Sequence, residues 1–192
     1  RMPVGGGIMV TASHNPPEYN GFKVCIGTET IFGDAIQRLS RAAHDAPAVG
    51  PGASSVTRLD VTGPYTDYML ENVGRLAGVR PGDAITCVVD SGNGTAGPVA
   101  PGLLHRLGIT VHELFSQPDG MFPNHHPDPT DEGNLSDLIA TVRQTGADLG
   151  IAFDGDTDRI GVVDELGRIV RGDQLLLILA EPVIAENPGA TC

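Results

Sequence analysis

The strongest constraint on the fold is a regular alternation of segment types between residues 84 and 153. Short apolar runs that are typical of strands cover 84–90, 110–115 and 148–153. A helix is expected over 98–107, and a second helix is expected after Asn134, which would cap it, because apolar residues recur there at helical spacing. The order strand, helix, strand, helix, strand predicts an α/β domain with parallel strands joined by crossover helices.

Further elements are expected outside this region: strands over 8–10 and 22–26, helices over 30–44 and 64–77, and a hairpin that pairs 160–164 with 168–170. Asp173 can cap a last helix that is apolar on every side. A helix of this kind is normally buried from all directions, yet few residues follow it. We therefore expect an exposed apolar patch there, with a tendency to self-associate through it.

Composition limits the classes of partner. The chain has 192 residues, of which 40% are hydrophobic and 19% charged, so a disordered chain is not expected. No apolar run reaches the ~18 residues of a membrane span. A net charge of −12 argues against nonspecific binding to nucleic acid or to an anionic membrane. The 3 Cys are too few and too scattered for a disulfide framework or a zinc site, which favours a cytoplasmic location. The sequence does not begin with methionine, so we expect a piece of a longer protein.

The sharpest chemical signal is the segment Asp-Gly-Asp-Thr-Asp-Arg at 154–159, here called the acidic loop. In an extended segment, Asp154, Asp156 and Asp158 would point the same way. Two carboxylates about 4 Å apart repel by about 4 kcal/mol at an effective dielectric of about 20, and a divalent cation such as Mg²⁺ removes that cost. The loop follows a strand, where ligand sites of α/β sheets tend to form. A solvated acidic turn is the alternative.

A calcium EF-hand is a rival interpretation of the acidic loop, because Glu165 falls at the twelfth position of such a motif. It fails at the sixth position, where Arg159 replaces the required glycine. The flanking segments are also expected to be strands, whereas an EF-hand needs helices.

A second candidate site is the polar turn after the first strand. Ser13 in such a turn can be a nucleophile if a neighbouring group activates it. The adjacent side chains of Ser13 and His14 tend to diverge, which disfavours a Ser–His hydrolase pair. Lys23 is the single lysine of the chain, and it can approach Ser13 if the chain folds back between the two strands. A phosphoryl group on Ser13 would then meet a cation. A polar turn with a chance lysine is the alternative.

Two other motifs carry less weight. The glycine-rich turn at 92–97 could cradle a phosphate, but it lacks the Lys-Ser/Thr of a P-loop and the Rossmann spacing. We interpret it as a tight turn from strand to helix. His125 and His126 have no third metal ligand at a recognised spacing, so we expect ordinary loop residues.

Taken together, these motifs resemble the α-D-phosphohexomutases, in particular the phosphomannomutase/phosphoglucomutase group. The resemblance rests on TASHNP at 11–16, YNGFKV at 19–24, GNGTAG at 92–97, PDGMFPNHHPDP at 118–129 and DGDTDR at 154–159. It implies three-layer α/β/α domains with a mixed, mainly parallel sheet, in a truncated chain. Residues 1–78 would be the C-terminal part of domain I, 79–168 domain II, and 169–192 the start of domain III.

The resemblance also implies a reaction. Ser13 would carry a phosphoryl group and exchange it with a hexose phosphate, through a 1,6-bisphosphate that also acts as activator. Mg²⁺ would be held by the phosphoserine at Ser13 together with Asp154, Asp156 and Asp158. Lys23 would exchange protons or bind phosphate, Arg159 would steady the phosphate, and His14 would assist. The sequence NGFKV after TASHNPPEY favours mannose or glucose phosphates over glucosamine phosphate.

This chain departs from the family in lacking the opening of domain I, most of domain III with its sugar-recognition loop, and domain IV. Positioning of the substrate supplies much of the rate of phosphoryl transfer, so we expect the isolated fragment to be nearly inactive. Two other functions stay open: a noncatalytic Mg²⁺-binding module, and a phosphohydrolase in which water replaces the sugar hydroxyl.

Overall fold

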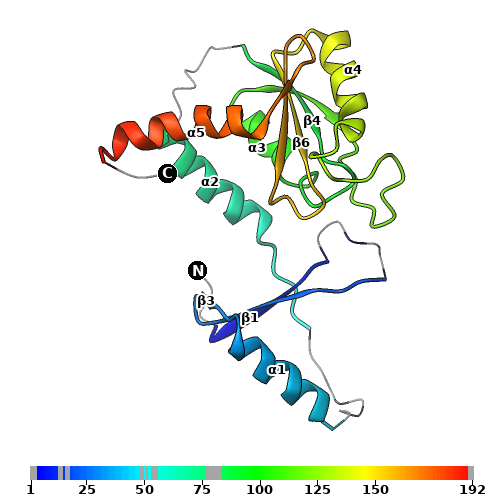
Figure 1. Cartoon of the computed structure of the whole chain (residues 1–192), viewed down its shortest axis with the longest axis vertical. Coiled ribbons are helices and arrows are strands. Elements are labelled where there is room, and N and C mark those ends of the chain that lie inside the picture. The colour runs from blue at the N-terminus through cyan, green and yellow to red at the C-terminus, as the bar shows by residue number, and fades with distance from the viewer. Residues whose placement is uncertain are drawn as a thin grey trace. The chain divides into compact units, whose positions relative to one another are not determined.

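The computed structural model describes residues 4–12, 15, 18–47, 50, 52, 56–76 and 84–189, with side chains left out at 73–76. The chain divides into two compact units, 1–61 and 62–192, and each is described by itself (Figure 1). Among the described residues, no helix combines the length and the apolar character that crossing a bilayer requires.

The first unit is an antiparallel sheet with one helix. Strands β1 (Gly6–Val10), β2 (Phe22–Ile26) and β3 (Glu29–Thr30) pair in that order, and α1 (Asp34–Asp45) follows. The predicted strands are confirmed. The predicted helix begins four residues later than expected, because Thr30 pairs with Cys25 and Gly33 has a φ of 56° that interrupts helical geometry. No described residue of this unit is buried. The sheet and its helix therefore enclose no core of their own.

The second unit is built on a five-stranded mixed sheet. Its strands are β4 (Thr86–Asp90), β5 (Thr110–Leu114), β6 (Leu149–Phe153), β7 (Ile160–Asp164) and β8 (Ile169–Val170), in the order β5-β4-β6-β7-β8. Strand β4 pairs in parallel with β5 and β6, whereas β6, β7 and β8 pair antiparallel. The predicted parallel strands, the hairpin and the α/β class are confirmed.

Helices of the second unit are α2 (Thr62–Leu76), α3 (Ala100–Arg106), the 3₁₀ turn η1 (Glu132–Leu135), α4 (Ser136–Thr145) and α5 (Gly172–Glu186). The chain runs from β4 through α3 to β5, and then through α4 to β6 on the other side of β4. Right-handed crossovers in opposite directions place α3 and α4 on opposite faces of the sheet, which produces three layers.

Two predicted helix caps are wrong. Asn134 does not cap α4: the side chain of Asp131 accepts the N–H of Gly133 at the start of η1, and Asn134 donates its amide to the carbonyl of Asp128 instead. Asp173 lies in the first turn of α5, and the residue at the cap position is Arg171. The Asn134 side chain is used by its contact with Asp128, and the cap position of α5 is taken by Arg171, so neither predicted residue is available as a cap.

The core of the second unit lies between α4 and the sheet. Its buried members are Val88, Leu135, Leu138, Val142, Ala147, Ala152 and Val163. Gly150 in β6 allows this packing, since a Cβ there would come within 2.7 Å of Leu138 and 2.8 Å of Val142. This α4-covered sheet therefore supports the loops at the ends of β4 and β6.

Among the described residues, nothing covers helix α5 in this way. Leu176, Leu177, Ile178 and Leu179 are 58–73% exposed, and Val183 is 56% exposed. The expected apolar patch is confirmed in the described structure, and its capacity for self-association stays a prediction.

Candidate functional site

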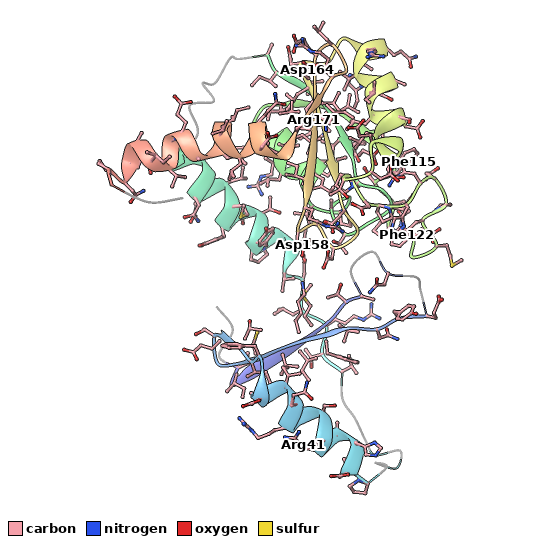
Figure 2. All side chains as sticks on the ribbon, in the orientation of Figure 1. Arg41, Phe115, Phe122, Asp158, Asp164 and Arg171 are labelled. Carbon is pink, nitrogen blue, oxygen red and sulfur yellow. The ribbon has the colours of Figure 1, made fainter. Side chains whose placement is uncertain are left out.

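The acidic loop lies at the carboxyl end of β6, and the glycine-rich turn 92–97 lies at the carboxyl end of the parallel neighbour β4. The chain leaves β4 toward β5 on one side and returns to β6 on the other, so this edge is a topological switch point, where α/β sheets form ligand sites. Figure 2 shows Asp158 at this end of the β6–β7 hairpin and Asp164 at the opposite end. The strands that flank the acidic loop confirm that it is not an EF-hand.

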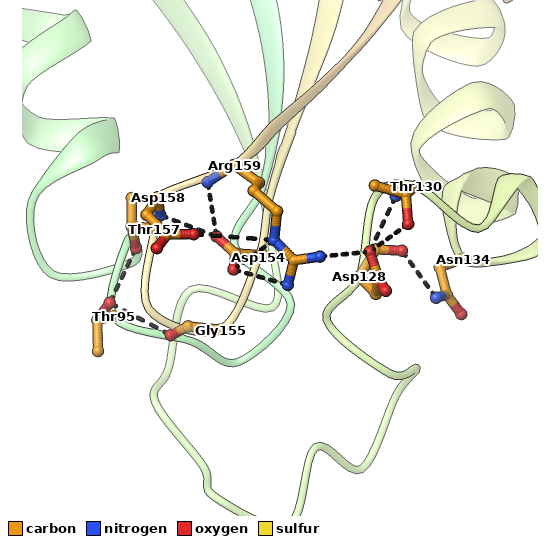
Figure 3. A network of polar contacts seen from close by, with 9 residues as sticks. All are labelled: Thr95, Asp128, Thr130, Asn134, Asp154, Gly155, Thr157, Asp158 and Arg159. Atoms are coloured by element: carbon orange, nitrogen blue, oxygen red, sulfur yellow. Dashed lines mark hydrogen bonds and ion pairs between the residues drawn. The ribbon is translucent and has the colours of Figure 1, made fainter. Parts of the chain in front are cut away.

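Asp154 is the buried anchor of the acidic loop, with a side chain that is 0% exposed. Its Oδ1 accepts the backbone N–H groups of Asp158 and Arg159, both at 2.9 Å. Its Oδ2 accepts Nε and Nη2 of the Arg159 guanidinium at 3.1 and 3.0 Å (Figure 3). These four hydrogen bonds compensate the burial of the carboxylate and hold the loop in one conformation.

The three predicted carboxylates converge. Oxygen atoms of Asp154, Asp156 and Asp158 all lie within 4.8 Å of one another, in a series from buried through half-buried to exposed. The segment is not extended, because the Thr157 N–H closes a tight turn onto the carbonyl of Asp154 at 3.1 Å. A turn brings the carboxylates together as an extended strand would, but it also directs them around one point. The donor set consists of hard oxygen atoms, as Mg²⁺ and Ca²⁺ prefer.

Arg159 connects the acidic loop to the long loop that precedes η1. Its Nη1 contacts Oδ1 of Asp128 at 3.2 Å. The same Oδ1 accepts the N–H and the hydroxyl of Thr130 at 3.1 and 2.7 Å, and Asn134 binds the carbonyl of Asp128 (Figure 3). Burial acts to lower the pKa of Arg159, but hydrogen bonds and charge from Asp154 and Asp128 outweigh it and raise the pKa. The guanidinium is therefore a fixed positive charge at the site.

The glycine-rich turn is confirmed as a tight strand-to-helix turn, and it also packs directly against the acidic loop. The N–H of Thr95 donates to the carbonyl of Gly155 at 3.1 Å. A Cβ at Gly94 would come within 2.8 Å of the same carbonyl oxygen, so only glycine allows the two loops to approach this closely. A groove of about 370 Å³ opens beside Asp156, with Thr95 and the ring of Tyr65 from α2 among its lining residues.

Sequence reasoning missed the role of His125. It lies in a loop as expected, but its Nε2 contacts both carboxylate oxygens of Asp90, at 3.0 and 3.2 Å. Asp90 is 0% exposed and also accepts the N–H of Gly92 at 2.9 Å. The hydrogen bond to Asp90 raises the pKa of His125 against the opposing effect of burial. The pair ties the 116–131 loop to the end of β4, and 35 residues of sequence separation left no local signal for it.

The other predicted catalytic residues belong to the first unit. Lys23 lies in β2 opposite Met9 of β1, so the chain does fold back as expected. Thr11 donates its N–H to the carbonyl of Gly21 at 3.0 Å, which closes the base of the loop that contains the serine. Ser13 and His14 themselves lie outside the described residues, and the approach of Lys23 to Ser13 stays a prediction.

Comparison with known proteins follows the same division of the chain. Residues 63–167 match the model of the phosphoglucomutase/phosphomannomutase alpha/beta/alpha domain II, and residues 1–46 match that of domain I. The chain is 46% identical over 187 residues to a phosphoglucomutase from Neisseria gonorrhoeae, which covers 97% of this chain and 39% of that protein. It is 45% identical over 184 residues to a phosphomannomutase/phosphoglucomutase from Pseudomonas aeruginosa, covering 96% of this chain and 38% of that protein.

A solved structure of a phosphoglucomutase/phosphomannomutase family protein from Burkholderia thailandensis superposes with a TM-score of 0.81 at 44% identity, over 96% of this chain and 39% of the other. The chain thus spans about two fifths of the length of these relatives, in agreement with the expected truncation. Sequence identity and structural superposition both extend over nearly the whole chain. The chain belongs to the phosphoglucomutase/phosphomannomutase family.

Proposed function

We propose that this chain is the phosphoryl-carrying and metal-binding part of an intramolecular phosphotransferase. The parent enzyme interconverts the 1-phosphate and 6-phosphate of a hexose, mannose or glucose, through a phosphoserine and a 1,6-bisphosphate intermediate. The observation that carries this proposal is the convergence of three carboxylates at the switch point of the sheet, in a chain of this family. The names of the relatives, phosphoglucomutase and phosphomannomutase/phosphoglucomutase, support the substrate class.

In this proposal Ser13 donates its phosphoryl group to a hydroxyl of the hexose monophosphate and accepts the other phosphate of the resulting bisphosphate. Hexose 1,6-bisphosphate is therefore also the activator that loads the serine. Lys23 serves as proton donor and acceptor or as phosphate ligand, His14 assists, and Arg159 steadies the phosphate. Arg159 stays charged beside two carboxylates, and its guanidinium can also form charge-assisted hydrogen bonds with the phosphate of a substrate.

Asp154, Asp156, Asp158 and the phosphoserine at Ser13 would hold Mg²⁺. The oxygen atoms of an octahedral Mg²⁺ site lie up to about 4.2 Å apart, so carboxylates already within 4.8 Å need only a small adjustment. Both oxygens of Asp154 already accept two hydrogen bonds each. Coordination of Mg²⁺ by Asp154 would therefore compete with one of these hydrogen bonds. When bound, Mg²⁺ would neutralise charge on the transferring phosphoryl group.

The isolated chain is expected to turn over hexose phosphates very slowly. It spans about two fifths of the relatives' length, and positioning of the substrate accounts for a large part of phosphoryl-transfer catalysis. Robust mutase turnover by the purified 192-residue chain would contradict this part of the proposal.

Mass spectrometry of the Ser13 peptide tests the chemistry directly. The full-length parent enzyme would be analysed as purified and again after incubation with glucose 1,6-bisphosphate and Mg²⁺, with Ser13→Ala as control. We expect a stable phosphate on Ser13 and none on the variant. Rapid release of inorganic phosphate would favour a phosphohydrolase, and a chain that binds Mg²⁺ but never carries phosphate would favour a noncatalytic module.

A further inference from the structure

The acidic loop contains a residue in an unfavourable backbone conformation. Thr157 has a φ of 67°, in the left-handed region that side chains rarely adopt. Among the described residues with positive φ other than glycine, it is the one with a β-branched side chain, for which this region is most unfavourable. Thr157 stands between Asp156 and Asp158, so its backbone angles set the directions of two of the three carboxylates.

The glycine-rich turn supplies contacts that stabilise this conformation. The hydroxyl groups of Thr95 and Thr157 lie 2.8 Å apart in a hydrogen bond. The Thr95 hydroxyl also donates to the carbonyl of Gly155 at 3.3 Å, and its N–H donates to the same carbonyl at 3.1 Å. Thr95 thus contacts the acidic loop on both sides of Asp156 (Figure 3).

We propose that Thr95 is a positioning residue for the cation site: its hydroxyl holds Thr157 in the left-handed conformation and thereby keeps the carboxylates of Asp156 and Asp158 converged. This inference rests on the proposed function of the acidic loop as a divalent-cation site. It gives the glycine-rich turn a role other than binding phosphate, since the turn shapes the loop that binds the cation. Both threonines are exposed, so loss of either hydroxyl leaves the packed core unchanged.

The variants separate the hydroxyl contact between Thr95 and Thr157 from the backbone conformation of Thr157. Thr95→Val keeps the shape of the side chain and removes the hydroxyl, whereas Thr95→Ser keeps the hydroxyl. Thr157→Val removes the other hydroxyl and keeps the β-branch, so it tests the same contact from the opposite side. Thr157→Gly removes the need for support, because glycine adopts a positive φ without steric cost.

The measurement is the affinity of each variant for Mn²⁺, followed by electron paramagnetic resonance of the free ion, with thermal melting to confirm folding. We expect Thr95→Val and Thr157→Val each to weaken Mn²⁺ binding by about three- to tenfold, the range that loss of one hydrogen bond represents. Thr95→Ser should bind within about twofold of wild type. When it is combined with Thr157→Gly, Thr95→Val should have less than about a twofold effect.

Unchanged affinity in Thr95→Val would overturn the positioning role while leaving the cation site in place. The same conclusion would follow if Thr95→Val caused an equal loss with and without the Thr157→Gly substitution. Failure of the wild-type chain to bind Mn²⁺ would instead overturn the cation site, and the positioning role with it. The two failures are therefore distinguishable from one titration series.

Discussion

Arg159→Gln should destabilise the second unit far more than the loss of an exposed ion pair would, because Arg159 pairs with a buried carboxylate. The guanidinium makes two hydrogen bonds to Asp154, whose side chain is 0% exposed, and a further contact to Asp128. Removing one partner of a buried ion pair costs about 3–5 kcal/mol, because an uncompensated charge stays behind. Arg159 is 33% exposed, and Asp154 keeps two backbone N–H donors, so we expect a loss of about 2–3 kcal/mol in the free energy of unfolding.

Urea unfolding in metal-free buffer, followed by circular dichroism, measures this loss. The opposite end of β7 offers a matched control in Arg168→Gln, since Arg168 pairs with Asp164 at 2.6 Å but is 69% exposed. A solvent-screened pair contributes little, so this variant should unfold close to wild type. Equal losses for the two variants would refute the argument that burial of Asp154 determines the cost. Saturating Mg²⁺ should recover much of the Arg159→Gln loss, because a cation bound only by the folded state stabilises it.

Three further predictions follow from individual contacts. Gly94→Ala should lower the free energy of unfolding, measured by thermal melting, by about 1–3 kcal/mol, because its Cβ would lie within 2.8 Å of a carbonyl oxygen of the acidic loop. The control Gly102→Ala, with nothing within 4 Å of its Cβ, should be neutral or stabilising in the same experiment. His125→Asn should lower the free energy of unfolding most at about pH 5.5 and least at about pH 9. Asp90 raises the pKa of His125, so the charged histidine stabilises the fold below its ordinary pKa, and this contribution is lost as pH rises through the raised value. A larger loss at alkaline pH would contradict the pairing. Leu177→Glu should reduce concentration-dependent association in sedimentation velocity, because Leu177 is 73% exposed on α5; a wild-type chain that stays monomeric at all concentrations would rule out association through this helix.

The framework of the second unit could be predicted because its signals are local. Apolar runs and helical spacing identify the strands and crossovers that the topology confirms. The helix caps could not be predicted in the same way, because a cap depends on which side chains remain available once the chain has folded. Asn134 has the right chemistry for a cap, but the carbonyl of Asp128 takes its amide. The late start of α1 has a similar cause, since pairing of Thr30 with Cys25 extends the sheet into the predicted helix.

In the candidate site too, features set by local spacing could be predicted, and contacts between distant residues could not. Convergence of Asp154, Asp156 and Asp158 was predictable from their spacing, although through a turn in place of an extended segment. The contact of Arg159 with Asp128 spans 31 residues, and no local pattern indicates it. The positive φ of Thr157 was also hidden, because residue type alone predicts the opposite conformation for a β-branched side chain.

We propose that the acidic loop is a divalent-cation site that serves phosphoryl transfer. Isothermal titration of the chain with Mg²⁺ tests it most directly, with Asp156→Asn as the ligand variant and Glu165→Gln, on the turn between β7 and β8, as the matched control. We predict one Mg²⁺ per chain, binding lost in Asp156→Asn, and wild-type binding in Glu165→Gln. Absence of binding, or binding that survives Asp156→Asn unchanged, would contradict the account.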